Sequence, residues 1–111
     1  RLNSCPNSCS ISSNNQLTPV VDYHMDECSW SGTSGEVKDS SGNNNNGTIQ
    51  GNVKTEEGKL CQSGYINKND SGADSNYIKT NSSPSLNALN ETLSITFWMK
   101  DDGSSSSGQI V

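Results

Sequence analysis

The sequence has few apolar residues, one histidine and no long hydrophobic run. Apolar residues make up 28% of the 111 positions, against about 45–50% in an average globular domain, so we expect only a thin core. No apolar stretch approaches the ~20 residues that a membrane-spanning helix needs. The net charge is −5 at pH 7 and the lysines are scattered. A basic patch for nucleic acid is therefore absent, and no nucleic-acid partner is expected.

Residue arrangements that are typical of enzymes are also missing. The single histidine, His24, lies on a strand-like stretch, and no serine stands in a nucleophile elbow, so a catalytic triad is not indicated. Asp26 and Glu27 are adjacent and would point to opposite faces of a strand, while Glu56 and Glu57 are expected in a turn. Neither pair has the alternation that would aim two carboxylates at one glycosidic bond. The sequence therefore predicts a protein that is not an enzyme.

What the chain has in abundance is Asn and Ser, which together make up about a third of it, and it carries four cysteines. A small, acidic chain of this kind fits an oxidising compartment, so we expect an extracellular or cell-surface location. Four cysteines allow three pairings. We favour disulfides between Cys5 and Cys9, which are close in sequence, and between Cys28 and Cys61. A zinc site is the alternative, although no CxxC pair or set of nearby histidines supports it.

The strongest pattern in the chain is the alternation within residues 92–100. The apolar residues at alternate positions are Leu93, Ile95, Phe97 and Met99. This period of two predicts a strand with one apolar face, and the residue types suit a pleated surface. We expect the apolar face to lie in the core and the other face to meet solvent, a loop or a ligand.

The rest of the chain divides into a lead-in and a strand-rich part. We predict that residues 1–18 are an irregular linker with a small loop closed by Cys5 and Cys9. We predict that residues 19–111 are one domain. Within it, residues 20–27 predict the first strand, and residues 83–89 a helical turn or loop. Shorter strand-like pieces lie at 47–50, 53–54, 58–61, 64–67 and 75–79. Many short strands separated by turn residues are typical of an all-β sandwich.

Residues 39–47 form an oxygen-rich loop that is a candidate calcium site. Ca²⁺ takes six to eight oxygen ligands from carboxylates, amides and backbone carbonyls. The candidate ligands are Asp39, Asn43, Asn44, Asn46 and, from the first predicted strand, Asp26. Only one of these carboxylates is local to the loop, and a plain Asn/Gly turn is the alternative.

Trp98 and Trp30 are the candidate ligand-binding aromatics, because a flat aromatic face can stack on the apolar face of a sugar. Trp98 lies on the face of its predicted strand opposite the apolar residues. The alternative is that Trp98 packs under a crossing loop as part of an outer core, since tryptophan is usually well buried.

The order of these segments resembles that of laminin-G-like, concanavalin A-like lectin and glucanase jelly-roll domains. The matching pieces lie at 23–27, 39–48, 58–59, 76–78 and 93–100. The resemblance covers residues 20–111 and implies an antiparallel β-sandwich, with calcium at this kind of loop in some members. The positions of Cys28 and Cys61 resemble a bacterial surface-protein type in which such a pair would staple two early strands.

The resemblance also bears on completeness and function. Such a domain usually needs a longer chain, and residues 109–111 look like the start of another strand, so we expect the N-terminal part of a sandwich. We predict a non-catalytic extracellular recognition or adhesion module that binds a glycan or a surface protein. The alternative is a structural spacer or a filament or pilus subunit that self-associates by strand addition across open edges. A glycoside hydrolase remnant is a third, disfavoured hypothesis.

Overall fold

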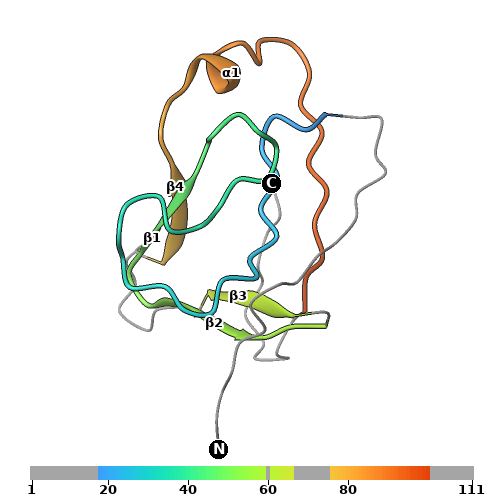
Figure 1. The fold of residues 1–111 in the computed structure, drawn as a ribbon. Coiled ribbons are helices and arrows are strands. Elements are labelled where there is room, and N and C mark those ends of the chain that lie inside the picture. Colours follow the sequence, from blue (N-terminus) through green and yellow to red (C-terminus); the bar gives the residue numbers. More distant parts are fainter. Residues whose placement is uncertain (1–17, 60, 67–75, 101–111) are drawn as a thin grey trace, which may run out of the picture.

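The computed structural model describes residues 18–59, 61–66 and 76–100 (Figure 1). Its elements are β1 (Gly47–Gln50), β2 (Val53–Glu57), β3 (Gln62–Ile66), β4 (Tyr77–Thr80) and the single-turn helix α1 (Pro84–Asn87). Within these ranges no helix has the length and apolar character required to cross a bilayer. The described part of the chain is therefore built mainly of strands and irregular segments, which confirms the predicted all-β class.

The four strands form two antiparallel pairs. β1 pairs with β4 in a register that places Ile49 opposite Ile78, and β2 pairs with β3 in a register that places Thr55 opposite Gly64. Each is a two-stranded sheet among the described residues. Two such pairs establish antiparallel strands but not a complete sandwich, so the jelly-roll architecture stays a prediction.

The chain turns from the first sheet to the second between β1 and β2. Gly51 adopts a φ of 72°, a left-handed conformation that glycine reaches without a steric penalty. The amide of Asn52 donates to the side-chain oxygen of Asn76 at 2.8 Å, so this corner is tied to the residue that precedes β4. The corner lets two consecutive strands belong to different sheets.

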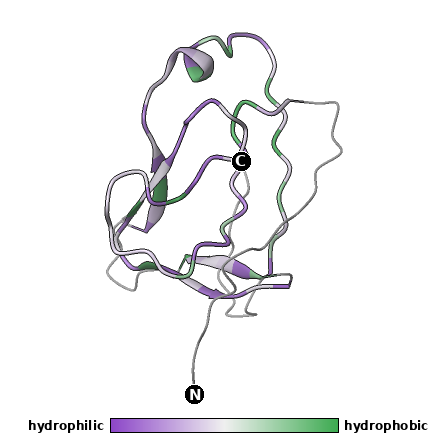
Figure 2. Ribbon diagram, in the orientation of Figure 1, coloured by the Kyte–Doolittle hydropathy of each residue, from purple (hydrophilic) through white to green (hydrophobic). Residues whose placement is uncertain are grey.

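The core of the described residues is small, as the composition predicts. Val37, Ile49 and Val53 are buried, and Tyr23, Trp30 and Ile78 pack against them. Val37 reaches β1 through two backbone hydrogen bonds with Gly47, at 3.0 and 2.8 Å. Figure 2 shows hydrophobic residues on β1 and β4 and again along the extended segment that ends the described chain.

The predicted first strand, residues 20–27, is not a strand in the structure. It makes a single isolated bridge, between Tyr23 and Asp39. Met25 has a φ of 57°, which is outside the extended region and interrupts the alternation that the sequence suggests. The prediction of a regular strand here was wrong, because the backbone bends to reach partners in the 39–47 loop.

The prediction that residues 92–100 bury their apolar face is also wrong for the described structure. Leu93, Ile95, Phe97 and Met99 are 55–69% exposed, and the segment pairs with no strand within the described ranges. It runs as an extended chain along one side of the molecule (Figure 1). Alternation specifies an apolar face, but burial needs a second layer opposite that face, and no described segment supplies one.

Candidate functional site

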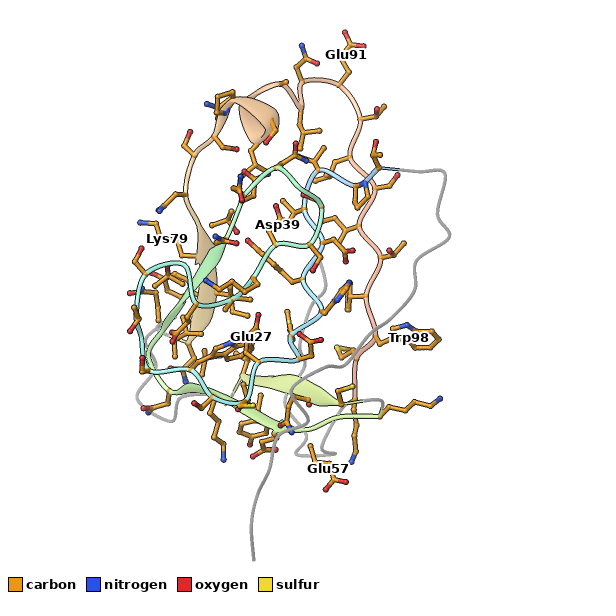
Figure 3. The ribbon with its side chains drawn as sticks, viewed as in Figure 1. Glu27, Asp39, Glu57, Lys79, Glu91 and Trp98 are labelled. Carbon is orange, nitrogen blue, oxygen red and sulfur yellow. The ribbon has the colours of Figure 1, made fainter. Side chains whose placement is uncertain are left out.

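The most exposed large hydrophobic side chain of the described structure is Trp98, which is 99% accessible. Figure 3 shows its ring projecting away from the rest of the molecule. Lys59, which follows β2, places its Nζ atom 6.0 Å from the ring centre, at the outer limit of a cation–π contact. The alternative in which Trp98 packs under a loop is therefore not what the structure shows.

An open hollow of about 260 Å³ lies beside this tryptophan and is lined by Thr96, Phe97 and Trp98. Pockets that enclose small molecules usually measure about 300–1,000 Å³. The hollow is smaller than this range and open to solvent, so the surface is a platform rather than an enclosed pocket. It suits a partner that stacks on an aromatic face and leaves much of its own surface in water.

Trp30, the other predicted ligand-binding aromatic, lies in a different environment. Its indole Nε1 donates to Glu27 at 3.1 Å, and its ring packs against the core. A Cβ atom added at Gly64 would lie 3.1 Å from the ring and 2.9 Å from Met25. Trp30 is thus engaged in packing, and of the two predicted aromatics only Trp98 offers an open face.

The Asp39 carboxylate organises the predicted calcium loop. Its Oδ1 atom accepts from the backbone amides of Asp22 at 2.8 Å and Ser41 at 3.0 Å. Its Oδ2 atom accepts from the hydroxyl of Ser41 and from the backbone amide of Asn45, both at 2.8 Å. Burial by itself would raise the pKa of this carboxyl, but the hydrogen bonds outweigh burial, and the pKa lies below its usual value.

The asparagines of the loop bind protein groups as well. Asn43 donates to the carbonyl of Val20 at 3.1 Å, and Asn46 accepts from the amide of Asp39 at 2.9 Å. Asn44 has a φ of 57°, which asparagine tolerates better than most residues. The side chain of Asn45 is buried and donates to Val20 and to Ser85 beside α1; sequence reasoning did not single it out.

These contacts do not fit a calcium ion. A carboxylate has about four lone-pair sites, and the four hydrogen bonds to Asp39 use them. The side-chain oxygen of Asn46 is likewise engaged. No cluster of three or more His, Cys, Asp or Glu residues, Asp26 included, could hold a metal in the ranges described. We therefore derive no function through calcium; the plain Asn/Gly turn accounts for this geometry.

Tyr23 connects the loop to β4. Its hydroxyl donates to the carbonyl of Asn45, so the 2.6 Å contact with Thr80 uses the threonine hydroxyl as donor. Burial raises the pKa of Tyr23, the Thr80 hydrogen bond opposes this, and the nearby Asp39 charge adds to it. One side chain thus joins residues that are 57 positions apart.

Tyr23→Phe is expected to lower the free energy of unfolding by about 1–2 kcal/mol, because a carbonyl and a hydroxyl lose a partly buried partner. Urea unfolding followed by fluorescence would measure the loss. Tyr77→Phe is the matched control, since Tyr77 lies on the outside of β4 and is 44% exposed. Equal stability of wild type and Tyr23→Phe would contradict the role given to this hydroxyl.

Two of the four carboxylates considered for glycoside hydrolysis, Glu27 and Glu56, are in structural contacts. Glu27 accepts from Trp30 and, at 2.7 Å, from the amide of Lys38. Glu56 and Glu57 lie in β2 rather than in the predicted turn, and Glu56 forms a 2.7 Å ion pair with Lys54. His24 contacts Asp22 at 3.2 Å. This arrangement gives the hydrolase hypothesis no new support.

The structure describes two of the four cysteines, Cys28 and Cys61. The carbonyl of Cys28 accepts from Thr55 of β2 at 2.9 Å, and that of Cys61 accepts from the amide of Gly58 at 3.0 Å. Neither is a free thiol. Cys5, Cys9 and most of the predicted linker lie outside the described residues, as do residues 109–111. The predicted pairing of Cys5 with Cys9 and of Cys28 with Cys61 stays a prediction.

Comparisons with known proteins give no family to which the chain can be assigned. No family model matches the sequence, and neither a curated protein nor a solved structure matches it. The resemblance to laminin-G-like and concanavalin A-like domains therefore stays a prediction that rests on the segment order alone.

Proposed function

We propose that this protein is a non-catalytic extracellular recognition module that contacts a glycan or a surface protein through Trp98. The observation that carries the proposal is the 99% exposure of this ring. Tryptophan is among the side chains that gain most from leaving water, and it is enriched where partners bind. A tryptophan held fully in water by a chain with few aromatic residues is best explained by a partner that covers it.

The surroundings of the ring support the same proposal. The hollow beside it is small and open, which suits a sugar ring or a protein side chain laid on the surface. Lys59 adds a hydrogen-bond donor within reach of a ligand on the ring. The net charge of −5 favours neutral or basic partners over polyanions. The extracellular setting rests on the four cysteines and on the composition.

Trp98→Ala is expected to weaken binding at least tenfold, which corresponds to about 1.4 kcal/mol, with no loss of thermal stability because the ring makes no core contact. Binding would be screened on a glycan array and against immobilised surface proteins, then quantified by calorimetry on the best ligand. Tyr77→Ala is the control, since it removes another exposed aromatic ring. Undiminished binding by Trp98→Ala, or an equal loss in the control, would refute the assignment.

The same experiment separates recognition from hydrolysis. A bound oligosaccharide should be recovered intact after long incubation with the protein. Release of new reducing ends would favour the glycoside hydrolase hypothesis instead.

A second candidate function is favoured by a different observation. Four large apolar side chains, Leu93, Ile95, Phe97 and Met99, are exposed on one segment; we call them the apolar stripe. Exposed apolar patches on soluble proteins often mark sites of association. The stripe supports a structural role in which the chain assembles through an open strand edge, as in filament or pilus subunits.

A further inference from the structure

The segment 92–100 has the properties of an unpaired edge strand. It is extended, and it pairs with no strand among the described residues. Nine residues at about 3.3 Å each span roughly 30 Å, which is longer than any of the four described strands. An extended chain with free backbone groups and an apolar side is a template for pairing with another strand.

The sequence of this segment is complementary to itself. In an antiparallel pair centred on Thr96, Ile95 of one copy lies opposite Phe97 of the other, and Leu93 opposite Met99. Residues directly opposite share a face, so the whole apolar stripe of both copies falls on one side. The central pair is Thr96 with Thr96, and aromatic with β-branched and Thr with Thr are among the favourable cross-strand pairs.

A register shifted by one residue loses this match. A shift by one residue would place Leu93 opposite Trp98 and mix the two faces of the strand. The only charged side chain of the segment, Lys100, lies opposite Thr92 in the centred register, so like charges do not face each other. The centred pairing has two-fold symmetry, in which both copies use the same surface.

The exposed area sets the expected strength. Exposed side chains of this size present on the order of 100 Å² each, so the stripe offers about 400 Å² per copy. In an edge-to-edge pair the two stripes lie side by side on one face, so only part of the ~800 Å² total is buried. This is below the ~1,200 Å² at which stable interfaces begin. The backbone hydrogen bonds of the pair and the side-chain contacts across it are therefore expected to give a weak, reversible dimer.

From these observations we propose that residues 92–100 pair antiparallel with the same residues of a second copy of this chain, centred on Thr96. The proposal rests on the second candidate function; the strands pair through their backbone edges, and the apolar stripe lies on the face that does not carry the Trp98 ring. Its failure would therefore leave the ligand-binding role of Trp98 standing, and the loss of ligand binding in Trp98→Ala would not depend on it.

Sedimentation equilibrium from about 1 to 200 µM tests the association, over the range that an interface of this size allows. The wild-type chain is expected to show a monomer–dimer equilibrium. Ile95→Lys, which places a charge opposite Phe97 in both copies, should weaken it at least tenfold. Leu89→Lys is the matched control, since Leu89 is an exposed leucine outside the segment. A monomer at every concentration, or equal effects of the two variants, would overturn the proposal.

Cross-linking tests the register. In the centred pair Thr96 is the one position that faces its own copy, so Thr96→Cys should form a covalent dimer under mild oxidation. The Cα atoms of directly opposite residues lie about 4.5–5.5 Å apart, within disulfide reach. Ser94→Cys lies opposite Trp98 and should not cross-link. Equal cross-linking at both positions, or none at Thr96, would contradict this register.

Discussion

Replacing Asp39 by asparagine is expected to lower the free energy of unfolding by about 3 kcal/mol, which corresponds to two charge-assisted hydrogen bonds at the low end of their range. The Asp39 carboxylate accepts from three backbone amides and one hydroxyl. The side chain of the new asparagine has one oxygen and one NH₂ group. The backbone N–H of Asn45 and the hydroxyl of Ser41 would then face a donor instead of a carboxylate oxygen. The loop then loses the group that holds it to the segment before it.

The pH dependence of this effect follows from the pKa of Asp39. The carboxyl has a pKa below its ordinary value of 3.8 in the folded protein, so folding favours the charged form. The stabilisation is present in full above the unfolded pKa and is lost as the pH falls through the folded pKa. We therefore expect the difference between wild type and Asp39→Asn to be constant near neutral pH and to shrink below about pH 4.

Thermal unfolding followed by circular dichroism from pH 2 to pH 7 would measure both effects. Asp26→Asn is the matched control, because it removes the same charge from a carboxylate that has no hydrogen bond among those described. A control that is as unstable as Asp39→Asn would show that the lost charge, rather than the hydrogen bonds, is responsible. A calcium titration of the wild type, with no shift in the melting temperature expected, would test the poor fit of the loop for calcium.

Gly47→Ala is expected to lower the free energy of unfolding by about 2 kcal/mol, the usual cost of overpacking a core. Gly47 begins β1, where it bridges to Val37 and pairs with Thr80. An added Cβ would lie 2.7 Å from the Cγ2 atom of Ile78 and 3.3 Å from both Tyr23 and Val37. These neighbours form the core, so a small shift of one of them disturbs the others.

Gly64→Ala is the comparison for this prediction. There the nearest atom to the added Cβ is the sulfur of Met25, at 2.9 Å, and a methionine side chain can adapt to a small intrusion. Gly47→Ala should therefore destabilise more than Gly64→Ala in urea unfolding. A larger loss of stability in Gly64→Ala than in Gly47→Ala would contradict this prediction. It would show that the residues around Gly47 accommodate an added methyl group more easily than their distances indicate.

Local patterns were enough to predict several features. Low apolar content predicted a small core, and frequent Gly, Asn and Ser between short apolar runs predicted strands joined by turns. The pieces at 47–50 and 53–54 became β1 and β2, and residues 83–89 contain α1, whose N-cap Ser83 accepts from the amide of Leu86 at 3.2 Å. These features depend on near neighbours, so the sequence by itself determines them.

Other features were decided only by tertiary structure, because they depend on residues that are distant in the chain. Asp39 looked like a calcium ligand until its partners, among them Asp22, were in place. Tyr23 lies in the predicted first strand, yet its hydroxyl joins Asn45 to Thr80. The alternation in residues 92–100 determined that one face is apolar. Whether that face is buried or free to bind depends on what lies opposite it, and a local pattern carries no information about that.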